Sequence, residues 1–248
     1  MKLVIEPERW RKFIKIATVY KQSPLIPTPV AECSDKGVRI MDMSEGSIAI
    51  ASMFRKDYFL EYSVGEPEIL PITTSLMDCL SFGFKSDKIS VETSKEEIKI
   101  SNGRDEYTTR KLDKGAEPFT LPVEFGEFGI VTKVTDKTGE LLGRVLLDGK
   151  ELEVAKAELY ELTSDGRSLF IVLKTEEGTF KRRLDVKQAV ALNPMDVYLD
   201  GEYYQHITEN LEGEVWLSVT PNVVNFSRKA KDHVYTYIVT TSTPPGSE

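Results

Sequence analysis

The strongest constraint on the fold of this chain is an internal repeat with an offset of 126 residues. Residues 89–112, ISVETSKEEIKISNGRDEYTTRKL, align without a gap on residues 215–238, VWLSVTPNVVNFSRKAKDHVYTYI. Apolar positions and charged turns coincide in the two segments. An earlier pair, 34–47 and 164–179, shares a turn, an apolar strand and an acidic turn with glycine. Because strands and turns recur in one order, the pattern predicts a tandem duplication.

The first half is predicted to be rich in strands and to contain two helices. A short strand at 3–5 leads to Pro7, where a helix begins and then ends before Pro24. Apolar residues with a helical period form its inner face: Trp10, Phe13, Ile14 and Ala17. A second helix is expected at 73–84. Strands are expected near 28–34, 37–43, 47–53 and 58–63, and three more end the half at about Lys111.

The second half leaves alternatives open. Residues 149–162 have apolar side chains at helical spacing, but Asp148-Gly149 could instead turn a hairpin. Residues 196–211 have the same ambiguity at Asp200-Gly201, where the repeat favours a helix near 202–211. Between the halves, 113–128 has no periodicity and contains two prolines and two glycines, which indicates a connector. Its apolar residues could simply pack against its own domains. Residues 242–248 are expected to be a disordered tail.

The charge of the chain is distributed unevenly. The formal net charge is -8, yet residues 7–22 carry five cations against the single acid Glu8. These cations are Arg9, Arg11, Lys12, Lys15 and Lys21. A local basic face on an acidic protein indicates contact with a polyanion. The alternative is a charged face that is only solvated.

The sequence offers little for catalysis. Neither a phosphate-binding G-x-x-x-x-G-K-[ST] loop nor a G-x-G-x-x-G turn occurs, and the only histidines, His206 and His233, lack metal-ligand spacing. We therefore expect no metal, no cofactor and no enzymatic activity. Cys33 and Cys79 are predicted to be buried thiols rather than a disulfide. No stretch approaches the length of an apolar membrane span, so an intracellular protein with no membrane contact is expected.

The order of these elements resembles the archaeal and eukaryotic sliding clamps, the proliferating cell nuclear antigen family. The resemblance is carried by DKGVRIMDMSEGSIAIASM (35–53), by YFLEYSV (58–64) followed by LPITTSLMDCLSF (70–82), and by DHVYTYIV (232–239). It covers most of the first half and the end of the second, and it is poor between about 135 and 160. It implies an α+β fold of two similar clamp-type domains, rich in strands, with helices on the concave face. The domains would be 1–112 and 129–241.

The resemblance implies a ring, usually of three chains, that encircles duplex DNA without sequence specificity and tethers DNA polymerase and other clamp-binding proteins. A homotrimer is therefore expected, with a monomer or a hetero-oligomer left open. Helices line the hole of such a ring, so the implied DNA contacts are Arg9, Arg11, Lys12, Lys15, Lys21 and Lys85. Phosphate contacts of this kind give attraction that depends on salt and permits sliding.

In the family, partner proteins insert a short peptide with apolar anchors into a pocket beneath the connector. The matching positions here are Met43, Ser47, Ile48, Phe119, Leu121, Tyr237, Ile238, Val239 and Thr240. Thr240 stands where the family has proline, and core packing would explain Tyr237 and Ile238 equally well. The subunit contacts would involve strands 106–113 and 178–185, with Arg110, Lys111, Lys181, Arg182 and Arg183.

Two features depart from the family's pattern. Residues 148–162 carry five acids against two lysines, and 196–212 carry no lysine or arginine, so half of the lining would repel phosphate. At the subunit contact, cations would face cations across an antiparallel seam, which destabilises strand pairs. An alternative function is therefore a divergent clamp paralogue that regulates or mimics a clamp by binding replication proteins, or the clamp itself, without encircling DNA.

Overall fold

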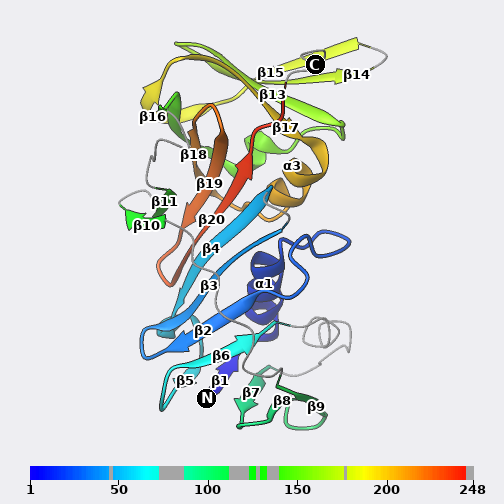
Figure 1. Ribbon diagram of the computed structural model, residues 1–248, viewed down its shortest axis with the longest axis vertical. Coiled ribbons are helices and arrows are strands. Elements are labelled where there is room, and N and C mark those ends of the chain that lie inside the picture. Colours follow the sequence, from blue (N-terminus) through cyan, green and yellow to red (C-terminus); the bar gives the residue numbers. More distant parts are fainter. Residues whose placement is uncertain are drawn as a thin grey trace. The chain divides into compact units, whose positions relative to one another are not determined.

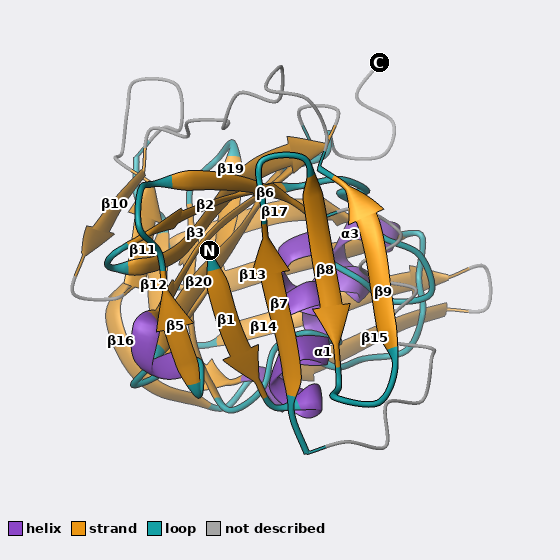
Figure 2. Ribbon diagram, turned by 90° about the horizontal axis from the view of Figure 1, so that it is seen from below, coloured by secondary structure: helices purple, strands orange, loops and turns teal. Residues whose placement is uncertain are grey.

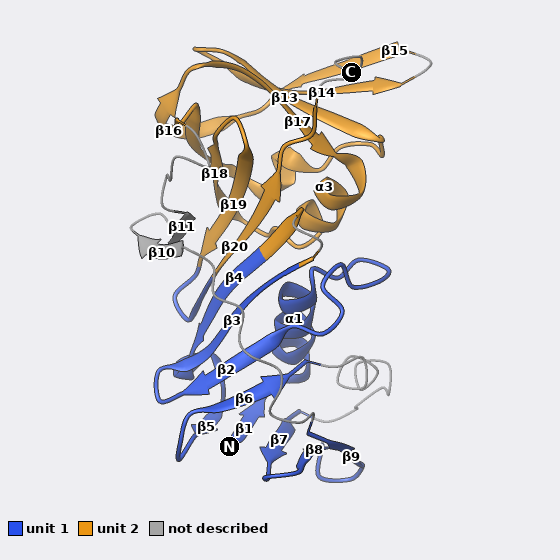
Figure 3. Cartoon of the chain, in the orientation of Figure 1, with its two compact units in different colours: residues 1–43, 50–121, 230–234 blue, residues 44–49, 122–229, 235–248 orange. Residues whose placement is uncertain are grey.

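The computed structural model describes residues 1–44, 47–72, 87–111, 123–126, 129–132, 140–175 and 178–243. The chain forms two compact units (Figure 3). Unit 1 contains Met1–Met43, Ile50–Leu121 and Ala230–Val234, and unit 2 contains Ser44–Ala49, Pro122–Lys229 and Tyr235–Glu248. Segments from both halves of the sequence thus contribute to each unit.

Unit 1 contains an antiparallel five-stranded sheet with the order β5-β1-β7-β8-β9 (Figure 2). Its strands are β1 (Lys2–Ile5), β5 (Glu61–Ser63), β7 (Ile89–Thr93), β8 (Glu97–Ser101) and β9 (Glu106–Arg110). Alternate residues of β7 and β8 are buried, and Val91 lies opposite Ile100. This period of two is what the repeated segment predicted.

Helix α1 (Pro7–Thr18) packs its apolar face into unit 1. The ring centroid of Phe13 lies 4.8 Å from that of Phe54, in an edge-to-face contact. Trp10, Ile14 and Ala17 are buried on the same face, as the helical period predicted. The helix ends at Val19, which has a left-handed conformation and donates its backbone N–H to Ile16 O. The predicted start at Pro7 and end before Pro24 are confirmed.

A second set of strands in unit 1 has the order β4-β3-β2-β6. These are β2 (Val30–Ser34), β3 (Gly37–Ser44), β4 (Ile48–Arg55, whose first residues belong to unit 2) and β6 (Glu68–Pro71), and η1 (Lys56–Tyr58) is a short 3₁₀ helix. Gly37 begins β3 with φ +132°, and a Cβ there would lie 2.0 Å from Phe54 O. Only glycine fits such a close approach of two backbones.

Unit 2 has a four-stranded antiparallel sheet with the order β15-β14-β13-β17. Its strands are β13 (Leu159–Asp165), β14 (Leu169–Thr175), β15 (Gly178–Arg183) and β17 (Pro194–Asp200). The other strands of unit 2 have the order β16-β12-β18-β19-β20 (Figure 1). They are β12 (Gly143–Asp148), β16 (Val186–Leu192), β18 (Glu214–Val219), β19 (Val223–Lys229) and β20 (His233–Thr240, whose first residues belong to unit 1).

The element order agrees with the predicted duplication. The three strands β7, β8 and β9 that end the first half correspond to β18, β19 and β20. The repeated apolar positions of β7 and β8 are buried, as are those of β18 and β19. Helix α3 (Gly201–Thr208) occupies the segment where the repeat favoured a helix. Asp200 caps it, because its carboxylate accepts hydrogen bonds from the backbone N–H groups of Glu202 and Tyr203.

Two interpretations of the sequence need correction. Neither alternative for 149–162 is correct: only the 3₁₀ helix η2 (Gly149–Leu152) forms there, β13 begins at Leu159, and β12 and β13 belong to different sheets and so form no hairpin. The connector is not irregular throughout, because β10 (Val123–Gly126) pairs with β11 (Gly129–Thr132). The predicted helix at 73–84 lies outside the described residues. Cys33 is a free, buried thiol, as expected, and Cys79 lies outside the described residues.

Candidate nucleic-acid and partner interfaces

Helix α1 presents a cationic face opposite its buried side. Arg11 and Lys15 are exposed and lie four residues apart, on the same face of the helix, and Lys12 beside them is half-buried. Like charges at this spacing destabilise a helix by a few tenths of a kcal/mol. Lys15 recovers part of that cost, because a cation in the last turn interacts favourably with the helix dipole. Two exposed cations on one face suit a polyanion in contact with that face.

Arg9 has a different environment, although the sequence grouped it with these cations. Its Nη1 donates to Tyr58 O at 2.8 Å and lies 3.0 Å from Asp232 Oδ2. Its guanidinium also lies 5.2 Å from the centre of the Tyr58 ring. Asp232 in turn contacts Nδ1 of His233 at 2.8 Å. Burial alone would raise the pKa of Asp232, but the contact with His233 and the charge of Arg9 lower it overall.

The other predicted DNA contacts are less closely defined. Lys21 follows the helix and is half-buried, whereas Lys85 lies outside the described residues. Unit 2 offers no matching cationic helix in the part of the chain that the structure describes. Helix α3 has Glu202 in its first turn and contains no lysine or arginine, and η2 spans only Gly149–Leu152. The cationic helix therefore belongs to the first half alone, among the described residues.

The predicted partner pocket is only partly brought together. In unit 2, Thr240 donates its backbone N–H to Ser47 O at 2.9 Å, so these two segments are adjacent. Tyr237, Val239 and Ile48 are buried in the core, and Ile238 is also buried. Burial raises the pKa of Tyr237 well above its usual range. The core-packing interpretation of these strand residues is therefore sufficient, and only Thr240 and the half-buried Ser47 reach the surface.

The remaining pocket positions lie elsewhere. Met43 belongs to unit 1 and is 40% exposed, which is unusual for a large apolar side chain and suits a partner contact. Phe119 and Leu121 lie outside the described residues.

Both strands expected at the subunit contact are edge strands. β9 ends the five-stranded sheet of unit 1, and β15 ends the four-stranded sheet of unit 2. Arg110 is exposed at the end of β9, and Lys181 and Arg183 are exposed on β15. Each strand therefore has one side on which its backbone groups lack a strand partner within its own sheet.

Two of the predicted contact cations are already engaged in ion pairs. Lys111 Nζ donates to Glu68 Oε2 at 2.5 Å, and Arg182 Nη2 lies 3.3 Å from Glu151 Oε2. Lys181 Nζ lies 4.3 Å from the centre of the Phe170 ring, which is a cation–π contact.

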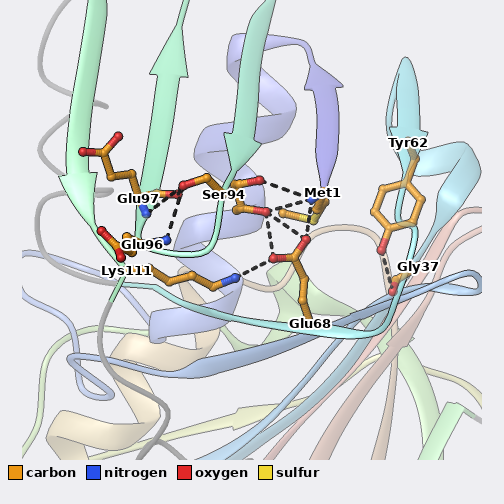
Figure 4. Close-up of polar contacts among 9 residues, drawn as sticks. Met1, Gly37, Tyr62, Glu68, Ser94, Glu96, Glu97 and Lys111 are labelled. Atoms are coloured by element: carbon orange, nitrogen blue, oxygen red, sulfur yellow. Dashed lines mark hydrogen bonds and ion pairs between the residues drawn. The ribbon is translucent and has the colours of Figure 1, made fainter.

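Glu68 connects three segments of unit 1 (Figure 4). Its carboxylate lies 2.5 Å from the Met1 α-amino group, accepts a hydrogen bond from Thr93 Oγ1 at 2.7 Å, and pairs with Lys111. Burial alone would raise the pKa of Glu68, but the hydrogen bonds from Lys111, Met1 and Thr93 lower it overall. The cluster fixes β1, β6 and β7 together with the end of β9. We call these four residues the Glu68 cluster.

Sequence reasoning missed the acids that engage these cations. Glu68, Glu151 and Asp232 are far from their partners in the sequence and are three among 40 carboxylates. No local signal distinguishes them. Among the described residues, no group of His, Cys, Asp and Glu could hold a metal ion, and no helix is long and apolar enough to cross a membrane.

Comparisons with known proteins identify the fold. No protein-family model and no curated protein matches the sequence. Several solved structures match over nearly the whole chain. One is "C-terminal region of FEN-1 bound to A. fulgidus PCNA", with a TM-score of 0.78, 11% identity, and 98% of each chain covered. A PCNA2-PCNA3 complex from Sulfolobus tokodaii matches with a TM-score of 0.74 and 12% identity, over 97% of this chain and 99% of that one.

A third structure, proliferating cellular nuclear antigen from Entamoeba histolytica, has a TM-score of 0.75 and 12% identity, with 98% of each chain covered. Identities this low establish the fold and leave the activity open. The fold class expected from the sequence is confirmed: the chain has the strand-rich fold of the sliding clamps over nearly its entire length.

Proposed function

We propose that this protein is a sliding clamp subunit, a processivity factor that tracks duplex DNA and tethers DNA polymerase and other replication proteins. The observation that carries the proposal is the combination of a clamp fold over nearly the whole chain with a cationic face on α1, in a protein of net charge -8. In this view, 1–112 and 129–241 are the two clamp-type domains.

The cations of α1 would contact DNA phosphates. Arg11 and Lys15 are exposed and reach out from a helix whose other face is anchored by Trp10 and Phe13. A rigid helix holds these charges in place, and contacts limited to phosphates permit movement along the duplex. An acidic exterior would discourage DNA from binding elsewhere on the protein.

Assembly would occur through the two edge strands. Within one chain, β4 and β20 are neighbouring strands: Arg55 N donates to Asp232 O in unit 1, and Thr240 N donates to Ser47 O in unit 2. The duplication makes β15 the counterpart of β4 and β9 the counterpart of β20. Because both counterparts are edges, they can pair head to tail between chains, and such a contact forms a ring when the rotation between successive copies closes.

Salt-dependent DNA binding tests the proposal. The triple variant Arg11→Glu, Lys12→Glu, Lys15→Glu is expected to lose affinity for a duplex, measured by fluorescence anisotropy at 50 and 200 mM salt. Its matched control is Lys36→Glu, Lys95→Glu, Arg104→Glu, which alters three exposed turn residues with the same change in charge. Primer extension with and without the protein measures processivity. Equal DNA binding by the two triple variants would remove α1 from the mechanism.

A specific observation favours a second function: the part of unit 2 that the structure describes contains no cationic helix. A clamp paralogue that binds replication proteins, or another clamp, without encircling DNA would need no such helix. It predicts no DNA affinity, together with capture of a purified clamp or polymerase. Primer extension would then show inhibition or no effect instead of longer products.

A further inference from the structure

Unit 2 contains a hollow at one end of its four-stranded sheet. The hollow has a volume of about 540 Å³ and lies between the turn from β13 to β14, the end of β15 and the edge strand β16. Its apolar wall includes Leu184, Val186, Ala189 and Leu192. A hollow of this size, with an apolar wall and a few convergent polar groups, is typical of a site for a small molecule.

The corresponding place in unit 1 is filled by aromatic side chains. In the two halves of the duplicated chain, β3, β4 and β5 correspond to β14, β15 and β16. The Tyr62 side chain extends from β5 to the start of β3, where its hydroxyl donates to Gly37 O at 3.0 Å (Figure 4). The Phe59 ring stacks on the Tyr62 ring, with 5.1 Å between their centroids. These two rings occupy the space between the three strands.

Two differences in the sequence leave this space open in unit 2. The connection from β4 to β5 spans 56–60 and contributes an aromatic ring, whereas the connection from β15 to β16 is only 184–185. Tyr62 of β5 and Ala189 of β16 each lie opposite a buried residue of the adjacent strand, β1 or β12. Because directly opposite residues share a face of an antiparallel pair, alanine points to the side that tyrosine fills in unit 1.

Two arginines line the hollow and form no ion pair among the described residues. Arg167 is exposed in the turn from β13 to β14, and Arg183 is exposed at the end of β15. The turn is well defined, because Asp165 Oδ1 accepts hydrogen bonds from the backbone N–H groups of Arg167 and Ser168. Both cations are therefore attached to a firmly held backbone beside the hollow.

The other charged residues of the lining are Lys187 and Asp185. Lys187 Nζ is already engaged, at 3.3 Å from Glu214 Oε1 and 3.9 Å from Asp148 Oδ2. Asp185 is the single acid of the lining, and its carboxylate forms no ion pair in the described part of the chain. Two uncompensated cations that line one hollow repel each other, and an anion bound between them would remove this cost.

We infer that this hollow binds a small molecule that carries a terminal phosphate group, a phosphate monoester. A phosphate monoester has nearly two negative charges at neutral pH, which matches two arginines, whereas each phosphate of a DNA backbone has one. The planar guanidinium group pairs with phosphate oxygens through two parallel hydrogen bonds. Ser168 and Gln188 also line the hollow and can donate further hydrogen bonds. The apolar wall would receive the body of the molecule.

This site is separate from the cationic face of α1, which belongs to unit 1. The inference adds a ligand that clamp function does not require, and it does not depend on the proposed function. DNA binding through α1 and phosphate binding in unit 2 can therefore be tested independently.

Calorimetric titration of the intact chain with adenosine monophosphate, in a buffer without phosphate, tests the inference. Saturation below about 1 mM is expected, and adenosine, which lacks the phosphate, should give no saturable binding. Arg167→Gln and Arg183→Gln should each weaken binding roughly tenfold or more, the usual effect of losing a hydrogen-bonded partner of a charged group. Asp185→Asn should strengthen binding, because it removes the single acid of the lining. Such a gain cannot come from misfolding.

Lys187→Gln is the matched control. It removes a cation from the same lining, but one that Glu214 and Asp148 already engage, so it should change the affinity far less than either arginine variant. Absence of saturable binding by wild type, or equal affinities of wild type and both arginine variants, would overturn the inference. Binding of a DNA duplex should be the same for Arg183→Gln and wild type. A parallel loss of duplex binding would identify the hollow as a DNA contact and overturn the assignment to a small molecule.

Discussion

Nη1 of Arg9 lies 3.0 Å from Oδ2 of Asp232, so the first turn of α1 is tied to the turn that precedes the last strand of the chain. Both residues belong to unit 1. The same guanidinium donates to Tyr58 O at 2.8 Å. Arg9 is thus held by internal partners, although the sequence placed it among the DNA contacts. Its neighbours Arg11 and Lys15, by contrast, are exposed.

Replacing Arg9 should therefore affect stability more than DNA binding. Arg9→Met keeps most of the aliphatic stem and removes the charge, and it leaves Asp232 and Tyr58 O without this donor. The expected loss is about 1 kcal/mol of unfolding free energy, because the side chain is about 40% exposed and solvent screens the pair. Urea denaturation measures this loss. We expect Arg9→Met to bind DNA with the same salt dependence as wild type. An Arg9→Met protein that is as stable as wild type but binds DNA weakly would contradict the structural role of Arg9.

Arg11 and Lys15 should show the opposite behaviour. Each of Arg11→Gln and Lys15→Gln removes one phosphate contact, so the slope of log affinity against log salt should fall by about 0.9 for each variant. Stability should stay within about 0.5 kcal/mol of wild type, because the side chains are exposed and the like-charge pair is relieved. Anisotropy titrations at several salt concentrations measure the slope, with Lys36→Gln as the control. A slope that does not change would exclude these side chains from phosphate contact.

The Glu68 cluster predicts a coupling between Glu68 and Lys111. Glu68→Gln leaves Lys111 with a charge and no carboxylate, in a site where its side chain is only 17% exposed. The expected loss is about 2 kcal/mol. Lys111→Met should cost a similar amount, and the double variant should cost less than the sum of the two, by about 1 kcal/mol or more. Urea denaturation of the four proteins gives the coupling, and simple additivity would show that the pair contributes nothing.

The pH dependence of stability follows from the lowered pKa of Glu68. A carboxylate with a lower pKa in the folded state stabilises the protein above its unfolded pKa, about 4.3, and loses this contribution as the pH falls through the folded pKa. The difference in unfolding free energy between wild type and Glu68→Gln should therefore be constant near pH 7 and shrink below about pH 4.3. A difference that grows as the pH falls would contradict the ion pair.

The sequence predicted the elements whose signal is local. The apolar spacing from Trp10 to Ala17 predicted α1, and the alternation in 89–112 predicted three strands and their repeat. A family resemblance at about 11% identity was detectable because turns and strands kept their order. Residues 149–162, where the sequence allowed a helix or a hairpin and neither forms, show the limit of such patterns. The apolar residues there have helical spacing, but Leu159 and Leu162 belong to a strand whose pairing with β14 and β17 overrides that preference.

The candidate site was harder to predict because charge alone does not reveal pairing. Arg9, Lys111 and Arg182 all read as free cations in the sequence. Their acidic partners are 223, 43 and 31 residues away, so only the fold brings them together. The cations of β15 were visible in the sequence, but the ion pair between Glu151 and Arg182 was not.

The junction at Asp200-Gly201 provides the last prediction, since the sequence allowed either a hairpin or a helix there. Asp200 accepts hydrogen bonds from two backbone N–H groups of α3, and a Cβ on Gly201 would lie 1.9 Å from Ala157 O. Asp200→Ala should therefore cost about 1 kcal/mol and Asp200→Asn much less, because asparagine also caps helices.

Gly201→Ala should be far more damaging than either Asp200 variant. No flexible side chain can yield at this contact, because the clashing atoms belong to the backbone of 157–158. The backbone N–H of Gly201 also donates to Glu158 O at 2.8 Å, so any shift that relieves the clash strains this hydrogen bond. A loss of about 3 kcal/mol or more is expected from overpacking of this kind. Thermal and urea denaturation measure it, and a Gly201→Ala protein as stable as wild type would show that the helix does not start against residues 157–158.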